Sequence, residues 1–205
     1  MKILIAAATK EEFSLLNGLN SKNHELDFLI TGVGMVAMAY SLTGHLKNNR
    51  YELAINCGIA GSFDRSIQMG EVVSVHEDIF SELGAEDGNE FLSLDQIGLK
   101  AKNSFKNTFL LNAAPMNILR EVRSITVNTI HGNDPTIKSV VNRFQPHIET
   151  MEGASFFFVC ENENIPSLQL RSVSNYIEKR NRESWNIPLA IENLNKTIIK
   201  IISTL

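Results

Sequence analysis

Residues 1–9 read Met-Lys-Ile-Leu-Ile-Ala-Ala-Ala-Thr, an apolar run that is followed at once by Lys10, Glu11 and Glu12. A continuous apolar run of this length is typical of a β-strand that is covered on both faces, as in α/β proteins. The run is too short for a secretory leader and charges follow it directly. We therefore interpret it as the first buried strand of an α/β fold.

Helical and strand-like patterns alternate along the rest of the chain. Apolar residues at helical spacing predict helices at residues 11–19, 35–46, 152–161 and 187–204. Apolar runs predict further strands at residues 28–30, 53–56, 71–75, 124–128 and 168–174. Thr9 is placed to cap the first helix, and the polar residues 82–107 are expected to form a surface excursion. We predict a single α/β domain over residues 1–205, with three layers in which helices flank a mixed central β-sheet.

Composition sets ordinary bounds on the class of protein. With 205 residues, of which 43% are hydrophobic, the chain is long enough to bury a sizeable core. A net charge of −4 and the lack of a basic cluster argue against nucleic acid as a partner, and no apolar run is long enough for a membrane span. Cys57 and Cys160 lie in apolar runs, which favours buried thiols in a reducing cytoplasm. The five histidines have no metal-ligand spacing, so we expect no metal site.

A glycine motif follows the second predicted strand. Residues 32–37 fit the G-x-G-x-x-A pattern of dinucleotide-binding proteins. However, the motif does not follow the first strand, and the strand at 53–56 ends without the acidic residue that would hold a ribose. We therefore favour glycines that permit a tight turn and close helix packing, and a backbone contact to phosphate stays open.

Polar residues follow several of the predicted strands. Glu12, the small residues at 58–62, Glu152 and the pair Ser174 and Asn175 all lie at strand ends. Alone, each glutamate at the start of a helix would only complement the helix dipole. Because strand ends in a sheet of this kind converge on one crevice, we expect a shared site. A carboxylate there can activate water, a second can accept hydrogen bonds from a ribose diol, and an amide can recognise a heterocyclic base.

Two further segments could line that site. His131 and Ile130 follow a predicted strand, and we interpret the histidine as structural while Ile130 is placed with the binding residues. The basic run at residues 179–182 is either a solvated loop or a cover over an anionic group of the ligand.

Several motifs together resemble the nucleoside phosphorylase/hydrolase superfamily. They keep the family's order over nearly the whole chain and lie at residues 11–12, 56–62, 69–73, 151–154 and 171–175. The resemblance is closest to purine nucleosidases that cleave 5′-modified nucleosides. Residues 177–182 with Trp185 are similar to a branch whose substrate carries a carboxylate in its 5′ extension.

The resemblance implies a role for each matching residue. Glu12 matches the position that activates the attacking water, Arg171 one that fixes water and carboxylate, and Glu152 the one that binds the ribose hydroxyls. Asn175 matches the base-recognition position, and Met151 packs under the ribose. The expected substrate contacts also include Gly58, Ile59, Ala60, Gly61, Ile130, Ser174, Arg180 and Arg182, with one of the two arginines meeting the 5′ carboxylate. The family needs no cofactor, and it implies a homodimer.

One position departs from the family's adenine-releasing members. In the methylthioadenosine/S-adenosylhomocysteine nucleosidases, an Asp stands where this chain has Asn175, and it protonates N7 of the base. Ile59 replaces a Ser, and Thr150 replaces an acidic residue. A general acid is worth about 10²–10⁴-fold, so its loss is costly for adenine. An Asn can pair with either base, but a 6-oxopurine is the better leaving group. We therefore favour hypoxanthine over adenine.

The attacking group is expected to be water. Phosphorylases of this fold surround the phosphate with cationic groups, whereas the first arginine of this chain is Arg50 and residues 32–34 have none nearby. Three alternatives stay open: an adenine-releasing nucleosidase, a nucleoside phosphorylase, and a binding protein that has lost catalysis. Retention of both Glu12 and Glu152 argues against the last of these.

Overall fold

The computed structural model describes the chain except residues 17–18, 20, 89 and 110–118. The strands are β1 (Lys2–Ala7), β2 (Glu25–Ile30), β3 (Leu53–Ser62), β4 (Val72–Phe80), β5 (Gly84–Asp87), β6 (Glu90–Ser93), β7 (Ser104–Lys106), β8 (Arg120–Thr126), β9 (Ile148–Thr150) and β10 (Ser167–Tyr176). The helices are α1 (Met35–Leu46), α2 (Asp134–Phe144), α3 (Gly153–Asn162) and α4 (Ile187–Ile202), with two short 3₁₀ helices, η1 (Glu11–Phe13) and η2 (Arg182–Ser184).

The central sheet is mixed, as predicted. Its strands follow the order β10-β4-β8-β9-β3-β1-β2, and β7 is paired to β4. Strand β10 pairs with β4 in the antiparallel direction and also with β3 in the parallel direction. The strands from β10 through β4, β8 and β9 to β3 therefore close into a ring, and β1 and β2 extend the sheet beyond it. Strand β3 therefore pairs with both β1 and β10, which are the first and the last strand in the sequence.

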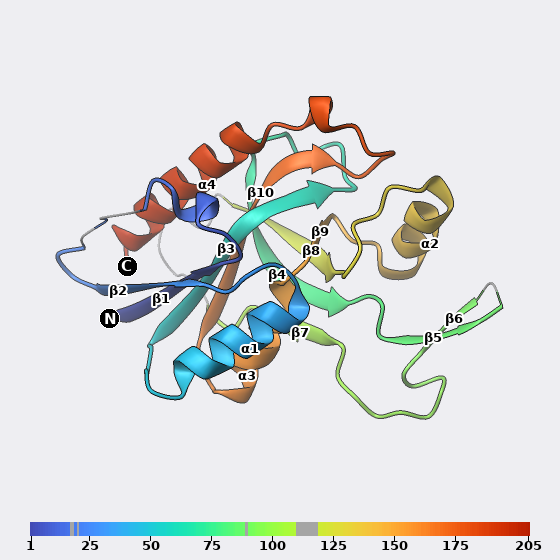
Figure 1. Ribbon diagram of the computed structural model, residues 1–205, viewed down its shortest axis with the longest axis horizontal. Coiled ribbons are helices and arrows are strands. Elements are labelled where there is room, and N and C mark those ends of the chain that lie inside the picture. Colours follow the sequence, from blue (N-terminus) through green and yellow to red (C-terminus); the bar gives the residue numbers. More distant parts are fainter. Residues whose placement is uncertain (17–18, 20, 89, 110–118) are drawn as a thin grey trace.

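Helices cover both faces of the sheet, which gives the three layers expected from the sequence. Figure 1 shows α1 and α3 on one face and α4 on the other. Met38 and Leu42 of α1 pack with Phe156 of α3 in one hydrophobic core. Leu194 and Ile198 of α4 pack in a second core on the opposite face. The predicted boundaries of α1 are confirmed, and those of α3 and α4 agree within two residues.

Two predicted elements near the site are wrong. The helix predicted at 11–19 is only the 3₁₀ turn η1 and a further turn to Leu16, and residues 17–18 lie outside the described residues. Thr9 does not cap it, because its backbone N–H and its hydroxyl both donate to the Glu12 carboxylate. The strand predicted at 53–56 is too short, because the small residues at 57–62 continue it as the second half of β3 and stay paired with β10 to the end of the strand.

Other segments add structure that the sequence patterns did not predict. Residues 82–107 contain the hairpin of β5 and β6 and the short β7, and the hairpin projects away from the sheet in Figure 1. Helix α2 and strand β9 were not predicted at all. Cys57 and Cys160 are free and buried, as expected. Among the described residues, the helices are too short or too polar to cross a bilayer.

Candidate active site

Glu12 is held at the end of β1 by three hydrogen-bond donors. Its Oε2 accepts from the backbone N–H of Thr9 at 3.0 Å and from Thr9 Oγ1 at 3.2 Å. Its Oε1 accepts from the backbone N–H of Ile59 in β3 at 3.1 Å. The donors fix the carboxylate over the middle of β3. A fixed carboxylate in this position suits general-base work.

Arg171 reaches the same place from β10. It is paired with Gly58 across the two strands and is only 1% exposed. Its guanidinium donates to the side-chain oxygen of Asn56 and to the Leu170 carbonyl. A Cβ atom added at Gly58 would lie 2.8 Å from Glu12 Oε1 and 3.1 Å from Arg171 Nη1. The absent side chain of Gly58 is therefore what lets the carboxylate and the guanidinium approach one another.

Glu152 joins this cluster from the turn between β9 and α3. Its Oε1 accepts from the backbone N–H of Gly34 at 2.8 Å, where Gly34 has a φ of 96°. Burial raises the pKa of Glu152, while the Gly34 hydrogen bond and the charge of Arg171 lower it and the charge of Glu12 raises it. Glu12, Glu152 and Arg171 thus form one electrostatic unit.

A buried polar network supports the start of α3 directly behind Glu152. Thr126 Oγ1 donates to Asp78 Oδ1 at 2.8 Å and accepts from the backbone N–H of Ala154 at the same distance. Gln169 Nε2 donates to Asp78 Oδ2 at 3.0 Å. Burial raises the pKa of Asp78 to about 6. The network ties the first turn of α3 to β4, β8 and β10, and so fixes where Glu152 stands.

Asn175 presents its amide to a small cavity. Ser174 Oγ donates to Asn175 Oδ1 at 2.8 Å, and Asn175 Nδ2 donates to the Tyr176 carbonyl at 3.2 Å. These two bonds orient the amide and leave its second N–H for a ligand, because an NH₂ group has two donors. The cavity has a volume of about 170 Å³ and is lined by Ile130, His131, Gly132, Asn175, Arg180 and Trp185, among others. A space this small suits one ring system rather than a whole drug-sized ligand.

The structure places the remaining predicted residues at different distances from the Asn175 amide. Ala60, whose carbonyl accepts from Ser174 Oγ at 3.3 Å, and Gly61, which is paired with Asn175, lie beneath the amide. Met151 immediately precedes Glu152. Arg180 lines the small cavity with its guanidinium 4.9 Å from the Trp185 ring centroid. Arg182 begins η2 with an exposed side chain, outside the lining of that cavity.

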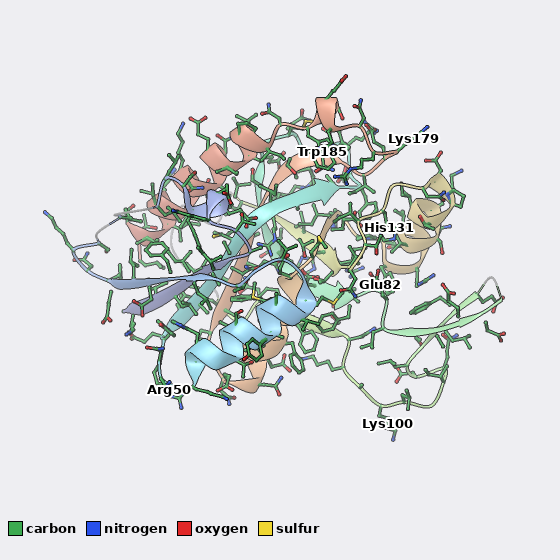
Figure 2. The ribbon with its side chains drawn as sticks, viewed as in Figure 1. Arg50, Glu82, Lys100, His131, Lys179 and Trp185 are labelled. Carbon is green, nitrogen blue, oxygen red and sulfur yellow. The ribbon has the colours of Figure 1, made fainter. Side chains whose placement is uncertain are left out.

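Two contacts of the site were not predicted. The Gly34 amide on Glu152 gives the glycine motif a purpose, and the motif was its only signal in the sequence. His131, interpreted as structural, lines the small cavity and is bonded to the buried Glu149. Figure 2 shows His131 and Trp185 on the side of the molecule toward which the arrowheads of β3 and β10 point.

The positions of the acidic and basic side chains show which of them could bind a metal ion or a phosphate. In the part of the chain that the structure describes, there is no group of three or more His, Cys, Asp or Glu side chains that could hold a metal ion. Arg50, the first arginine of the chain, donates to the Leu46 carbonyl at the carboxyl end of α1. Figure 2 places it at the opposite end of α1 from the turn that holds Gly34.

Comparison with known proteins identifies the family. Residues 22–204 match the model of the phosphorylase superfamily, so the chain belongs to this superfamily and the predicted family is confirmed. The chain is similar to futalosine hydrolase of Thermus thermophilus, with 25% identity over 199 residues that cover 94% of this chain and 88% of that protein. It is also 25% identical to 5′-methylthioadenosine/S-adenosylhomocysteine nucleosidase of Glaesserella parasuis over 235 residues, with 99% of each covered.

A solved structure confirms the fold. The native structure of futalosine hydrolase of Helicobacter pylori superimposes with a TM-score of 0.85, covering 98% of this chain and 97% of that chain. Its sequence identity to this chain is 18%, so the likeness shows the fold alone.

Replacing Gly58 with Ala tests the convergence of Glu12 and Arg171. The added Cβ would lie 2.8 Å from Glu12 Oε1, so the carboxylate must move. We expect Gly58→Ala to lower kcat by about 10²-fold, as small displacements of reacting groups do, and to cost about 1–3 kcal/mol of stability. Steady-state kinetics and thermal unfolding measure the two effects. Unchanged kcat in a folded variant would contradict the arrangement described.

Replacing Glu152 with Gln tests the buried charge. Because the pKa of Glu152 is raised in the folded protein, the folded state binds more protons than the unfolded state above about pH 4.5. Stability is therefore lost as pH rises through this window, and Glu152→Gln avoids the loss. We expect the variant to unfold at a higher temperature than the wild type at pH 7 but not at pH 4. The exposed Glu121→Gln serves as the control and is expected to show no such difference.

Proposed function

We propose that this protein is a nucleoside hydrolase that cleaves the N-glycosidic bond of futalosine and releases hypoxanthine and dehypoxanthine futalosine in the alternative menaquinone pathway. The observation that carries the proposal is the arrangement of Glu12, Arg171 and Glu152 around Gly58, next to a cavity with a donor amide at Asn175. The similarity to futalosine hydrolase of Thermus thermophilus supports it.

The proposed reaction gives a role to Glu12, Glu152 and Arg171. Glu12 accepts a proton from water, and the water oxygen forms a bond to C1′ of the ribose. The bond from C1′ to N9 breaks, and its electron pair passes to the purine. Glu152 holds the ribose hydroxyls, and the guanidinium of Arg171 lies beside the Glu12 carboxylate at Gly58. The purine takes up a proton from solvent, and Glu12 returns its own proton to solvent. No metal or organic cofactor takes part.

The amide of Asn175 supports hypoxanthine as the leaving base. An amide can donate a hydrogen bond to N7, but it has no proton to transfer. Adenine needs the proton more than hypoxanthine does, because the 6-oxygen of hypoxanthine takes up part of the negative charge. The second N–H of Asn175 is the one that its internal hydrogen bonds leave for the base.

Water rather than phosphate is proposed as the nucleophile. A phosphate next to C1′ needs cationic side chains, and Arg171 is already bonded to Asn56 and to the Leu170 carbonyl. Arg50 lies at the far end of α1. The site therefore suits a neutral nucleophile.

The contact to the 5′ end of the substrate is a separate expectation. The expectation that Arg180 or Arg182 meets the 5′ carboxylate stays a prediction, as does the cytoplasmic location. Arg180 lies at the cavity that also holds Asn175, which is the base end of the proposed site.

We also propose that two copies of the chain associate through the outer face of α1. Val36 and Tyr40 are 80% and 84% exposed there, although both are apolar in character. Together with Leu83 and Phe158 they line a mostly apolar hollow of about 750 Å³. Exposed apolar patches of this kind mark interaction surfaces. A second copy is the occupant that the superfamily implies.

One assay separates the proposed function from its alternatives. The protein is incubated with futalosine, inosine, adenosine and methylthioadenosine without phosphate, and the released base is identified by chromatography. We expect hypoxanthine from futalosine as the fastest reaction. Adenine released first would indicate the adenine nucleosidase, and dependence on phosphate the phosphorylase. Binding of nucleosides without release of any base would indicate a non-catalytic binding protein.

Replacing Asn175 with Asp tests the choice of base. The two side chains have the same shape, but Asp can carry the proton that adenine needs. We expect Asn175→Asp to raise kcat/KM for methylthioadenosine relative to futalosine by about 10²-fold, the lower value for a general acid. Asn162→Asp, which makes the same change at an exposed position at the end of α3, is the control. An unchanged preference would mean that Asn175 does not select the base.

Replacing Tyr40 with Glu tests the association of two copies. A charge in the centre of an apolar contact is expected to convert a dimer to a monomer, because the carboxylate loses its hydration there. Sedimentation equilibrium measures the mass of the particle. Leu99→Glu changes an exposed apolar residue outside the face and is expected to leave the mass unchanged. A wild-type protein with the mass of one chain would exclude the proposed dimer.

A further inference from the structure

His131 and Glu149 form a closely bonded pair at the edge of the small cavity. The side chain of Glu149 is 0% exposed, and its Oε1 accepts from the backbone N–H of His131 at 3.0 Å. Its Oε2 lies 2.6 Å from Nδ1 of the His131 ring. One carboxylate therefore fixes both the backbone and the ring of His131. The rotation and tilt of the ring are set by a group inside the protein.

The contact with Glu149 occupies one of the two ring nitrogens. Nδ1 and the Glu149 carboxylate are the partners in this short contact. Nε2 is on the other side of the ring from Glu149, and among the described residues the hydrogen bond of the ring is the one at Nδ1. The His131 side chain is 16% exposed and lines the cavity of about 170 Å³. Nε2 is thus the one polar atom of this ring that is left for a ligand.

The register of three strands brings this pair to Asn175. Glu149 of β9 is paired with Gly61 of β3, and Gly61 is paired with Asn175 of β10. Residues that are paired across a sheet point to the same face, and Gly61 between them has no side chain. The backbone of Gly61 accordingly lies between Asn175 on one side and Glu149, which holds His131, on the other, and Ile177 Cδ1 fills the place that a side chain of Gly61 would take.

The buried Glu149 carboxylate has His131 as its charge partner. A buried carboxylate is costly unless a cation compensates it. In the described part of the chain, His131 is the one basic side chain within ion-pair distance of Glu149. The pair is neutral overall when the ring is an imidazolium, and Nε2 then carries a hydrogen as well. A preorganised donor of this kind stabilises negative charge that develops during a reaction.

We propose that His131 is a second catalytic residue at the base, and that its Nε2–H donates a hydrogen bond to the 6-oxygen of the departing purine. The inference rests on the proposed function and deepens it, because it names the atom of the base that is recognised. Glu149 is the positioning residue that holds the ring. The proton stays on Nε2, so the balance of the cleavage reaction is unchanged. The negative charge from the broken bond spreads onto the 6-oxygen of the purine, which already accepts a hydrogen bond from His131 Nε2–H.

The proposal gives Asn175 and His131 different atoms of one base. Asn175 donates to N7, which adenine and hypoxanthine share, whereas His131 donates to a position where adenine has an amino group. With adenine, the 6-amino group and the Nε2–H of His131 would face each other, and because both are donors neither would have an acceptor. The pair therefore selects a 6-oxopurine over a 6-aminopurine by a contact that Asn175 alone does not provide.

The test compares bases with and without the 6-oxygen. Inosine and purine riboside differ only at this position, and the ratio of their kcat/KM values is measured for the wild type, His131→Phe, His131→Gln and Glu149→Gln. His131→Phe keeps a ring against Phe63, with which His131 makes an edge contact, but lacks the donor. We expect it to lower the ratio by about 10²-fold, the effect of losing one such donor. His131→Gln retains an N–H donor and is expected to recover part of the ratio.

A binding measurement and a control complete the test. The dissociation constants of hypoxanthine and unsubstituted purine, measured by calorimetry, are expected to change in the same sense and do not depend on turnover. Glu149→Gln is expected to give an intermediate ratio, because the ring keeps its place but loses its counter-charge. His24→Phe makes the same substitution before β2, at the opposite end of the sheet, and is expected to leave the ratio unchanged.

Distinct outcomes separate this proposal from the proposed function. If His131→Phe lowers activity on both nucleosides equally and the ratio stays that of the wild type, His131 is structural and the proposal is overturned. An unchanged preference for hypoxanthine over purine in the binding measurement overturns it as well. If the wild type releases no base from any nucleoside, the proposed function fails, and the calorimetric comparison still decides the role of His131.

Discussion

The site depends on two positions of the central strand where there is no side chain. At Gly58, a Cβ would lie 2.8 Å from the Glu12 carboxylate, and at Gly61 one would lie 2.2 Å from Ile177 Cδ1. Strand β3 pairs with β1, β9 and β10, so three segments that are far apart in the sequence lie beside these gaps. The approach of the Glu12 carboxylate, the Arg171 guanidinium and the Asn175 amide is thus a consequence of sheet pairing combined with missing side-chain atoms.

Around these gaps the protein buries more carboxylates than a core alone would tolerate. Each is held in a different way: Glu12 by three donors, Glu152 by one backbone amide, and Glu149 by a histidine. Asp78 has only hydroxyl and amide partners, and burial raises its pKa to about 6. Such groups reduce stability, but they keep the polar surface of the site in place before a ligand arrives.

The elements that were predicted correctly from the sequence are those with a regular spacing of apolar residues. The buried strands and the helix α1 show clear patterns, because one face or both faces must be apolar. Helix α2 was not predicted, because only Val140 of it is buried. Its Pro135 in the first turn is nevertheless a signal for the start of a helix. The small residues after Asn56 were placed beyond the end of the strand, but they belong to a strand that needs small side chains to pass beneath the site. Local pattern cannot distinguish these two uses of glycine.

The sequence indicated four residues of the candidate site, but it did not indicate their hydrogen-bond partners. Glu12, Glu152 and Asn175 were placed at strand ends, where topology alone indicates a shared crevice, whereas Arg171 lies inside β10 and only the family resemblance indicated it. The contacts from Gly34 to Glu152 and from His131 to Glu149 join segments 118 and 18 residues apart, and they depend on the final packing. Helix α1 adds a physical link of its own, because its first turn holds Glu152 while its outer face is open and apolar. If two copies associate through Val36 and Tyr40 and Glu152 binds the sugar, as proposed, reciprocity of linked equilibria couples the two events, and the concentration of the protein then affects its affinity for the substrate.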